Sequence, residues 1–95
     1  MIIAIDYDDT FTRDTVLWRN FIELARNLGH EVICVTNRST PPSQGKEQDL
    51  LPEDVQIVCA DNRFKRVAAL QAGYQIDIWI DDNPGSIGQS NKLIW

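Results

Sequence analysis

The sequence alternates short apolar segments with segments of helical character, and this alternation limits the fold more than any other feature. Five apolar segments span residues 2–6, 31–36, 55–60, 76–80 and, as a short edge strand, 92–95. The second and third are rich in Val and Ile without polar alternation, which is typical of strands covered on both faces. Such alternation predicts a parallel sheet joined by crossover helices. The sequence therefore predicts an α/β fold, a Rossmann-like three-layer sandwich with a mainly parallel sheet of four to five strands.

The first helix is expected from about Asp14, which can cap its N-terminus, to residue 28, with Gly29 as its stop. A row of apolar residues at helical spacing should lie on the sheet. This row consists of Leu17, Phe21, Leu24 and Leu28, with Val16 and Ala25 beside it.

The second helix is expected over residues 62–72, with Gly73 at its end and with Val67, Leu70 and Ala68 or Ala69 available for packing. Residues 38–54 contain three prolines and one glycine, so they are predicted to form a loop with one helical turn at residues 46–51. A loop of this length is often functional, although a simple surface insertion is an equal alternative.

The length and charge of the chain set broad limits on its function. With 95 residues it is expected to form one domain over residues 1–95. The net charge of −5, without a long basic run, argues against tight non-specific binding to nucleic acid or to an anionic membrane. No signal segment or membrane-spanning run is recognised, which predicts a cytoplasmic protein. The two cysteines, Cys34 and Cys59, are expected to be buried reduced thiols.

Acidic residues follow the first and fourth apolar segments: Asp6 and Asp8 in one case, Asp81 and Asp82 in the other. Because ligands bind outside the carboxyl ends of parallel strands, these four carboxylates are expected to converge. Close carboxylates repel unless a cation lies between them or one takes a proton. Mg²⁺ prefers such hard oxygen ligands. The pattern therefore favours a Mg²⁺ site over a solvated acidic turn.

Two further residues suit the same site. Asp6 and Asp8 are two apart, so in extended geometry their side chains point the same way. A Mg²⁺ site made for a phosphoryl group also needs hydrogen-bond donors and a second positive charge on the non-bridging oxygens. Thr36, after the second strand, and Lys65, in the second helix, are placed to supply them, although each residue alone is ordinary in its position.

Taken in order, these motifs resemble those of the haloacid dehalogenase-like (HAD) superfamily of phosphohydrolases. The first motif of that family, an apolar strand followed by D-x-D-x-T, matches residues 2–10. An apolar strand ending in Thr matches residues 32–36, and a lysine ahead of the last motif strand matches Lys65. A final apolar strand ending in an acidic pair matches residues 78–82. The resemblance spans residues 2–85, nearly the whole chain.

The sequence departs from the family pattern at one position and leaves a choice at another. The family often has Gly where this chain has Asp9, and Asp is expected to be tolerated because it adopts unusual turn conformations more readily than most residues. Lys46 is a fallback for the third motif.

The resemblance implies a role for each matched residue. Asp6 would be the nucleophile that forms an aspartyl phosphate, and Asp8 the general acid and then the general base. Thr36 and Lys65 complete the catalytic set. Mg²⁺ would be held by the Asp6 carboxylate, the Asp8 backbone carbonyl and Asp81, with Asp82 acting directly or through water. An acid at Asp8 favours phosphatase over dehalogenase chemistry.

Members of the family often carry a cap domain after the first or second motif, and neither place in this chain has room for one. An open site implies a large phosphorylated substrate, such as a phosphoprotein or a nucleic-acid end, or a nucleotide covered by a loop or a neighbouring subunit. The loop over residues 38–54 is the candidate lid. Asn37, Arg38 and Asn83 are the candidate substrate contacts.

Two other classes of function stay open. One is a nucleotide- or phosphate-binding module with little turnover on the same fold. The other is a receiver-like phosphoryl switch, in which Asp61 would be the phosphorylated residue. The motif order argues against a receiver, because a receiver needs its Thr after the fourth strand and its Lys after the fifth, whereas Thr36 follows the second and Lys65 precedes the fourth.

Overall fold

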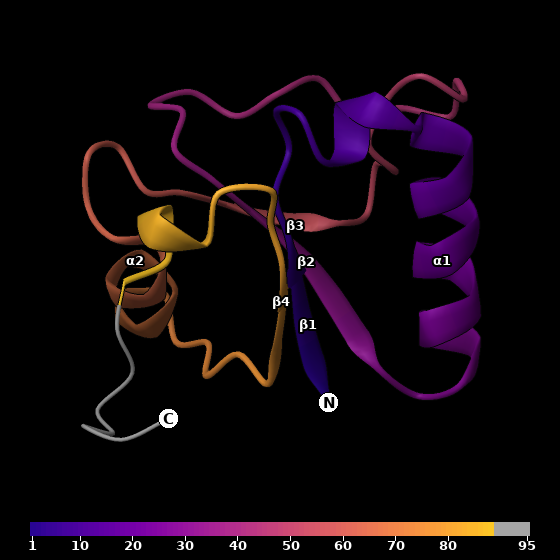
Figure 1. Ribbon diagram of the computed structural model, residues 1–95. Coiled ribbons are helices and arrows are strands. Elements are labelled where there is room, and N and C mark those ends of the chain that lie inside the picture. Colours follow the sequence, from indigo (N-terminus) through magenta and orange to yellow (C-terminus); the bar gives the residue numbers. More distant parts are fainter. Residues whose placement is uncertain (89–95) are drawn as a thin grey trace.

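A computed structural model describes residues 1–88 and contains a four-stranded parallel sheet (Figure 1). The strands, in the spatial order β3-β2-β1-β4, are β1 (Ile2–Ile5), β2 (Glu31–Thr36), β3 (Gln56–Cys59) and β4 (Ile78–Ile80). All three pairings are parallel, and Ile5 lies opposite both Cys34 and Ile80. The predicted α/β fold with a parallel sheet is confirmed. The fifth strand predicted at residues 92–95 falls outside the described residues.

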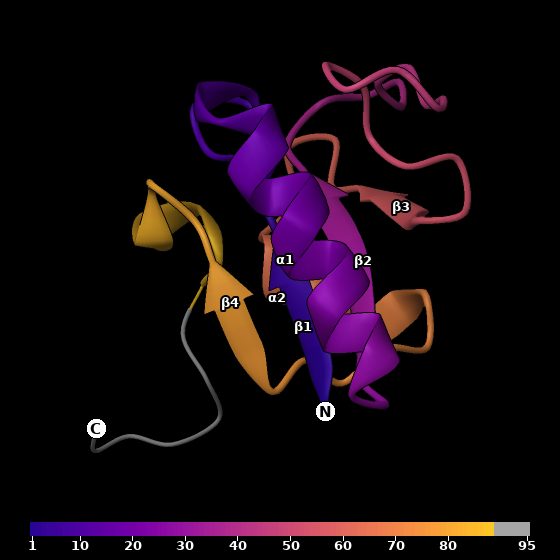
Figure 2. The same ribbon diagram turned by 90° about the vertical axis from the view of Figure 1, so that its right-hand side faces the viewer.

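Two helices cover opposite faces of the sheet, which gives three layers. Helix α1 (Thr15–Asn27) and helix α2 (Lys65–Gln71) lie on either side of the strands in Figure 1, and Figure 2 shows α1 in front of them. Two short 3₁₀ helices, η1 (Phe11–Arg13) and η2 (Pro84–Ser86), follow β1 and β4. Among residues 1–88, no helix is both long enough and apolar enough to cross a bilayer.

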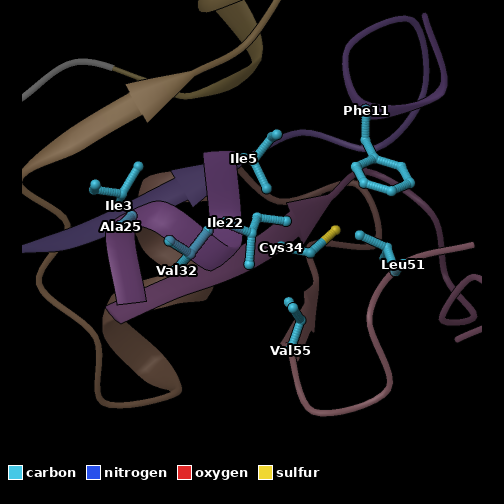
Figure 3. Packing of buried hydrophobic residues seen from close by; sticks show 9 residues of the cluster. All are labelled: Ile3, Ile5, Phe11, Ile22, Ala25, Val32, Cys34, Leu51 and Val55. Atoms are coloured by element: carbon cyan, nitrogen blue, oxygen red, sulfur yellow. The ribbon is translucent and has the colours of Figure 1, made fainter. Parts of the chain in front are cut away.

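The strands are stabilised because most of their side chains are apolar and pack in one of two buried layers, one on each face of the sheet. On the α1 side, Ile3, Ile5 and Ile22 pack with other buried residues from η1 and the loop after β2 (Figure 3). On the α2 side, Ala4, Ile33, Val35, Val58 and Ala60 pack against Ala68 and Ala69. Burying one large aliphatic side chain contributes about 1.5–3 kcal/mol, so two clusters stabilise both faces.

The helix ends follow from their capping residues. The Asp14 side chain accepts a hydrogen bond from the Leu17 amide at 3.0 Å, so this predicted N-cap is confirmed. Gly29 and Gly73 have φ angles of 90° and 94°, the left-handed conformation with which glycine ends a helix. Both predicted stops are confirmed.

The predicted packing face of α1 is confirmed for Phe21 and Ala25 and is wrong for the exposed residues Val16, Leu17, Leu24 and Leu28. Leu17, Leu24 and Leu28 are 53%, 59% and 67% exposed, and the side chains that meet the sheet are Ile22 and Ala25, with Trp18 and Phe21 partly buried beside them. The helix is apolar over more of its circumference than the sheet can cover. The small Ala25 lets the helix approach closely, and the two aromatic rings, packed edge to face, fill the space around it.

The start of α2 and two of its predicted contacts are also wrong. The helix begins at Lys65 rather than Asn62, because Asp61 and Asn62 have φ angles of 48° and 70°, which a right-handed helix cannot contain. Only the small Ala68 and Ala69 are buried on the sheet, whereas Val67 and Leu70 are exposed.

The loop between β2 and β3 contains no helix at residues 46–51; it has a single hydrogen-bonded turn there, in which the Leu50 amide donates to the Glu47 carbonyl at 3.1 Å. Gln44 and Leu51 instead form an isolated bridge, and the Leu51 side chain is fully buried. The Arg19 guanidinium of α1 donates hydrogen bonds to the carbonyls of Gly45, Lys46 and Leu50. These contacts give three loop carbonyls a hydrogen-bond donor, so the segment is an anchored loop.

Candidate functional site

Three carboxylates meet at the edge of the sheet where β1 and β4 end. Asp6 follows β1, and Asp81 and Asp82 follow β4, its hydrogen-bonded neighbour. Each of the three offers an oxygen within 4.8 Å of the other two. The Asp6 amide donates to the Ile80 carbonyl at 2.9 Å, which ties the two strand ends together. We call Asp6, Asp81 and Asp82 the carboxylate cluster.

Lys65 inserts a positive charge into this cluster. Its ammonium nitrogen lies 2.7 Å from Asp6 Oδ1 and 2.6 Å from Asp81 Oδ2, and its residue is only 1% exposed. As the first residue of α2, it reaches the cluster from the side opposite to α1. The alternative, Lys46, is exposed and lines a cavity beside α1. Lys65 is therefore the lysine that contacts the carboxylates.

Thr10 is a site residue for which the sequence predicts no role, although it ends the D-x-D-x-T motif. Its hydroxyl lies 3.2 Å from Asp6 Oδ2 and 3.1 Å from Asp82 Oδ1, and it accepts a hydrogen bond from the Asp82 amide at 3.2 Å. One hydroxyl proton serves one carboxylate at a time, so Thr10 links the two strand ends rather than neutralising either. The available signal was its position four residues after Asp6 in the D-x-D-x-T pattern.

The environment shifts the pKa values of Asp6 and Asp82 in opposite directions. Burial raises the pKa of Asp6 to about 6, because desolvation of the carboxylate outweighs its hydrogen bond from Lys65. Asp82, on the exposed side, has a lowered pKa because Asp6, when protonated, can donate a hydrogen bond to it, and because the Thr10 hydroxyl lies within hydrogen-bond distance. Burial opposes the charge on Lys65, yet hydrogen bonds to Asp6 and Asp81 together raise its pKa. The ammonium therefore stays charged beside its partners.

The donor set fits a divalent cation. Three carboxylates and one ammonium leave two negative charges uncompensated when all are ionised. Carboxylate oxygens are ligands that Mg²⁺ and Ca²⁺ accept. In the described part of the chain no group donates to the Asp8 backbone carbonyl, which the sequence predicts as a further ligand. The cluster could thus hold a metal ion.

The Asp8 carboxylate, in contrast, lies outside the cluster. It pairs with Arg38 through two hydrogen bonds, from Nε at 2.9 Å and from Nη2 at 2.8 Å, and this guanidinium also lies 4.9 Å from the centre of the Tyr7 ring. The hydrogen bonds from Arg38 lower the pKa of Asp8. The strand ends at Ile5 and the chain then turns, so Asp8 does not share the orientation of Asp6 that extended geometry predicts.

That turn depends on Asp9, which adopts a φ of 60°. The expectation that Asp would tolerate an unusual conformation at this position is confirmed. The Asp9 amide donates to the Thr12 hydroxyl at 3.0 Å, and the Phe11 amide donates to the Asp6 carbonyl at 3.2 Å. The turn therefore brings Thr10 back to the cluster while Asp8 faces solvent.

The remaining predicted residues lie around the rim. Thr36 ends β2 at the same edge of the sheet, is 1% exposed, and accepts a hydrogen bond from the Arg38 amide at 3.2 Å. The Asn83 amide donates to Asp81 Oδ1 at 2.9 Å, which fixes that carboxylate. Asn37 lines a small cavity with residues that precede α2.

A further cavity lies away from the carboxylate cluster. It measures about 490 Å³ and is formed by α1 and the loop after β2. The two arginines that line it are already engaged, Arg19 with loop carbonyls and Arg26 with Asp54 at 2.8 Å. Volume alone does not identify the chemistry, and the shifted pKa values of Asp6, Lys65 and Asp82 direct attention to the carboxylate cluster instead.

No protein-family model, curated protein or solved structure matches this chain. The similarity of its motifs to the HAD superfamily therefore stays a prediction from the sequence, and the function has to be argued from the site itself.

Proposed function

We propose that this protein is a Mg²⁺-dependent phosphatase that hydrolyses phosphomonoesters through an aspartyl phosphate on Asp6. The observation that carries the proposal is the buried contact of Asp6 with Lys65, at 2.7 Å, beside two further carboxylates at one sheet edge. Bound Mg²⁺ would be held by the carboxylate cluster and the Asp8 carbonyl, and would neutralise charge on the phosphoryl oxygens.

Asp6 is suited to act as the nucleophile because both of its oxygens are oriented. Lys65 donates to Oδ1 and Thr10 to Oδ2. In the proposed reaction an Asp6 oxygen bonds to phosphorus while the bond from phosphorus to the ester oxygen breaks, and the departing oxygen takes a proton from Asp8. Water then attacks phosphorus, gives its proton to Asp8 and releases phosphate and the Asp6 carboxylate.

Asp8 can donate a proton only after its pair with Arg38 opens. While paired, it is ionised, which suits a base that accepts a proton from water. A substrate phosphate is a competing partner for the Arg38 guanidinium, because guanidinium binds phosphate as readily as carboxylate. We therefore assign Arg38 to the substrate, with its release from Asp8 coupled to phosphate binding.

Lys65 and Thr36 would bind the non-bridging oxygens of the phosphoryl group. Both residues are about 1% exposed, so donors held there would act where water is largely excluded and need little reorganisation. Residues 1–88 contain no second folded unit to act as a cap over the sheet edge. The proposed substrates are a nucleotide, a nucleic-acid end or a phosphoprotein.

The test is hydrolysis of an aryl phosphate with and without Mg²⁺. We expect Asp6→Asn to lower kcat by at least about 10³-fold, because a positioned nucleophile cannot be replaced by the remaining groups. Asp49→Asn, an exposed aspartate in the loop after β2, is the matched control and should retain activity. Intact-mass analysis of quenched protein should find one added phosphoryl group on wild type only. Equal rates for wild type and Asp6→Asn would refute the proposal.

A second candidate function is phosphate or nucleotide binding with little turnover. The pairing of Asp8 with Arg38 favours it, since the residue proposed as general acid is held ionised by two hydrogen bonds. Binding of phosphate without hydrolysis in the same assay would select this candidate.

A further inference from the structure

A cavity of about 310 Å³ is lined in part by residues that are next in the sequence to two proposed phosphoryl contacts. Its lining comes from the residue after β2, from the turn before α2 and from η2, and consists of Asn37, Asn62, Arg63, Phe64 and Ser86. Asn37 follows Thr36 and Phe64 precedes Lys65 in the chain. Because consecutive Cα atoms are about 3.8 Å apart, the backbone of two lining residues adjoins the backbone of two proposed phosphoryl contacts.

Phe64 is an exposed aromatic residue in a fixed position. It is 58% exposed at the start of α2. The backbone of Gly88 lies against the base of its ring, since a Cβ on that glycine would come within 2.9 Å of Phe64 Cβ and Cγ. The Arg66 amide donates to the Ile87 carbonyl at 2.9 Å and holds this segment against the helix. A ring that is accessible yet held in this way can stack on a planar group without being ordered first.

The polar lining of this cavity is suited to hydrogen bonds with a neutral ligand. The side chains of Asn37 and Asn62 each offer both donors and an acceptor, and Ser86 offers a hydroxyl. The Arg63 guanidinium is engaged with the carbonyls of Cys59 and Ala60 and with the Gln71 side chain. No carboxylate is among the lining residues. The cavity therefore combines an aromatic face with amide groups, and three nitrogens of its Arg63 guanidinium already donate hydrogen bonds.

We propose that this cavity binds the base of a nucleoside monophosphate whose phosphate occupies the site at Asp6. Phe64 stacks on the base, and Asn37 and Asn62 bind the heteroatoms at its edge. This assignment rests on the proposed function, because it takes the phosphate position from it. A phenyl ring such as that of phosphotyrosine has no ring heteroatoms, so it would gain no hydrogen bonds from these amides.

Size and charge favour a single nucleotide over a strand. The volume of about 310 Å³ is at the lower end of the range for small-molecule sites, about 300–1,000 Å³. The net charge of −5 opposes the many phosphates of a long nucleic acid.

The test compares kcat/KM for adenosine 5′-monophosphate and for glycerol phosphate, which has no aromatic group. We expect Phe64→Leu to lower kcat/KM for the nucleotide about tenfold more than for glycerol phosphate, because stacking of one base on an aromatic side chain contributes that order of selectivity. Phe64→Trp should restore the preference. Leu70→Ala is the matched control, an exposed apolar residue of the same helix, and should change neither value. Equal losses on both esters after Phe64→Leu would overturn the assignment.

Two further experiments identify the molecule that supplies the base, and they distinguish a failure of this proposal from a failure of the proposed phosphatase activity. If Phe64→Leu lowers kcat/KM for phosphotyrosine as strongly as for the nucleotide, base recognition is overturned. If Phe64→Leu lowers kcat/KM for a 5′-phosphorylated oligonucleotide as strongly as for the nucleotide, base recognition is supported, and the base belongs to a strand end. Binding of adenosine monophosphate to Asp6→Asn is then measured by equilibrium dialysis, with and without Phe64→Leu. If no ester is hydrolysed but Phe64→Leu weakens this binding, the phosphatase fails and the base site stands. Binding that does not depend on Phe64 overturns the base site.

Discussion

Two ion pairs at one edge of the sheet contrast in their surroundings. In the carboxylate cluster, the side chains of Lys65 and Asp6 are 2% and 8% exposed, whereas those of Arg38 and Asp8 are 46% and 52% exposed. Burial raises the pKa of Asp6 to about 6, and hydrogen bonds from Arg38 lower the pKa of Asp8. Two aspartates separated by a single residue therefore have pKa values shifted in opposite directions.

The contrast indicates how the two carboxylates can have different tasks. Charges in the dry interior interact strongly and cannot exchange partners easily, while exposed charges are screened and can do so. Asp6 is held in place for attack on phosphorus, in the proposed reaction, and Asp8 can pass from Arg38 to a substrate and back. Substitutions at the two basic residues should therefore differ sharply in effect.

The largest effect is expected for Lys65→Met. This change leaves Asp6 and Asp81 without their buried positive partner, and breaking a buried pair in this way destabilises a protein by about 3–5 kcal/mol. Urea unfolding of the metal-free protein measures the free energy of unfolding. Lys46→Met, at an exposed lysine, is the control and should stay within about 0.5 kcal/mol of wild type. Comparable losses of unfolding free energy in the two variants would show that the buried ion pair stabilises the fold no more than an exposed lysine does.

The convergence of the carboxylate cluster could be predicted from sequence because it depends on topology alone. Parallel strands end at one edge, so Asp6 after β1 and Asp81 and Asp82 after β4 had to approach one another once the sheet was inferred. The contact of Lys65 with the cluster did not follow from its position alone; Lys65 was selected because a phosphoryl site needs a second positive charge.

Features that depend on side-chain competition could not be predicted in this way. The orientation of Asp8 and the return of Thr10 to the cluster depend on the φ of 60° at Asp9, which the residue type permits but does not require. The packing face of α1 was ambiguous because leucines and aromatics offered two adjacent apolar faces, and the fit of Ile22 and Ala25 to the sheet decided between them.

The cavity beside Phe64 could not be predicted from the sequence either, because it depends on how separate segments pack. Its lining comes from three separate segments, and each contributes only one to three residues. No periodicity or motif joins Asn37 to Phe64. Their proximity results from the neighbouring ends of β2 and β3 and from the turn at Asp61 and Asn62, whose positive φ angles delay the start of α2.

The second prediction concerns proton competition in the cluster. Because the pKa of Asp6 in the metal-free protein is raised to about 6, a proton must leave this carboxylate when Mg²⁺ binds below that pH. We expect Mg²⁺ affinity, measured by calorimetry, to weaken by about tenfold for each pH unit below about 6, and to level off above it. Asp49→Asn, at an exposed aspartate in the loop after β2, is the control and should leave this dependence unchanged. A constant affinity down to about pH 5 would contradict the raised pKa of Asp6.

The smallest effect is expected for Arg38→Gln, which removes the exposed pair. The loss in free energy of unfolding should be a small fraction of that for Lys65→Met, because solvent screens both partners. The folded-state pKa of Asp8 is depressed below its usual 3.8, so its contribution to stability is present above pH 3.8 and is lost as the pH falls through the lowered value. Urea unfolding should therefore show a difference between wild type and Arg38→Gln at neutral pH that disappears in acid, where Asp8 is protonated. A difference that persists in acid would mean that Arg38 stabilises the fold through Tyr7 rather than through Asp8.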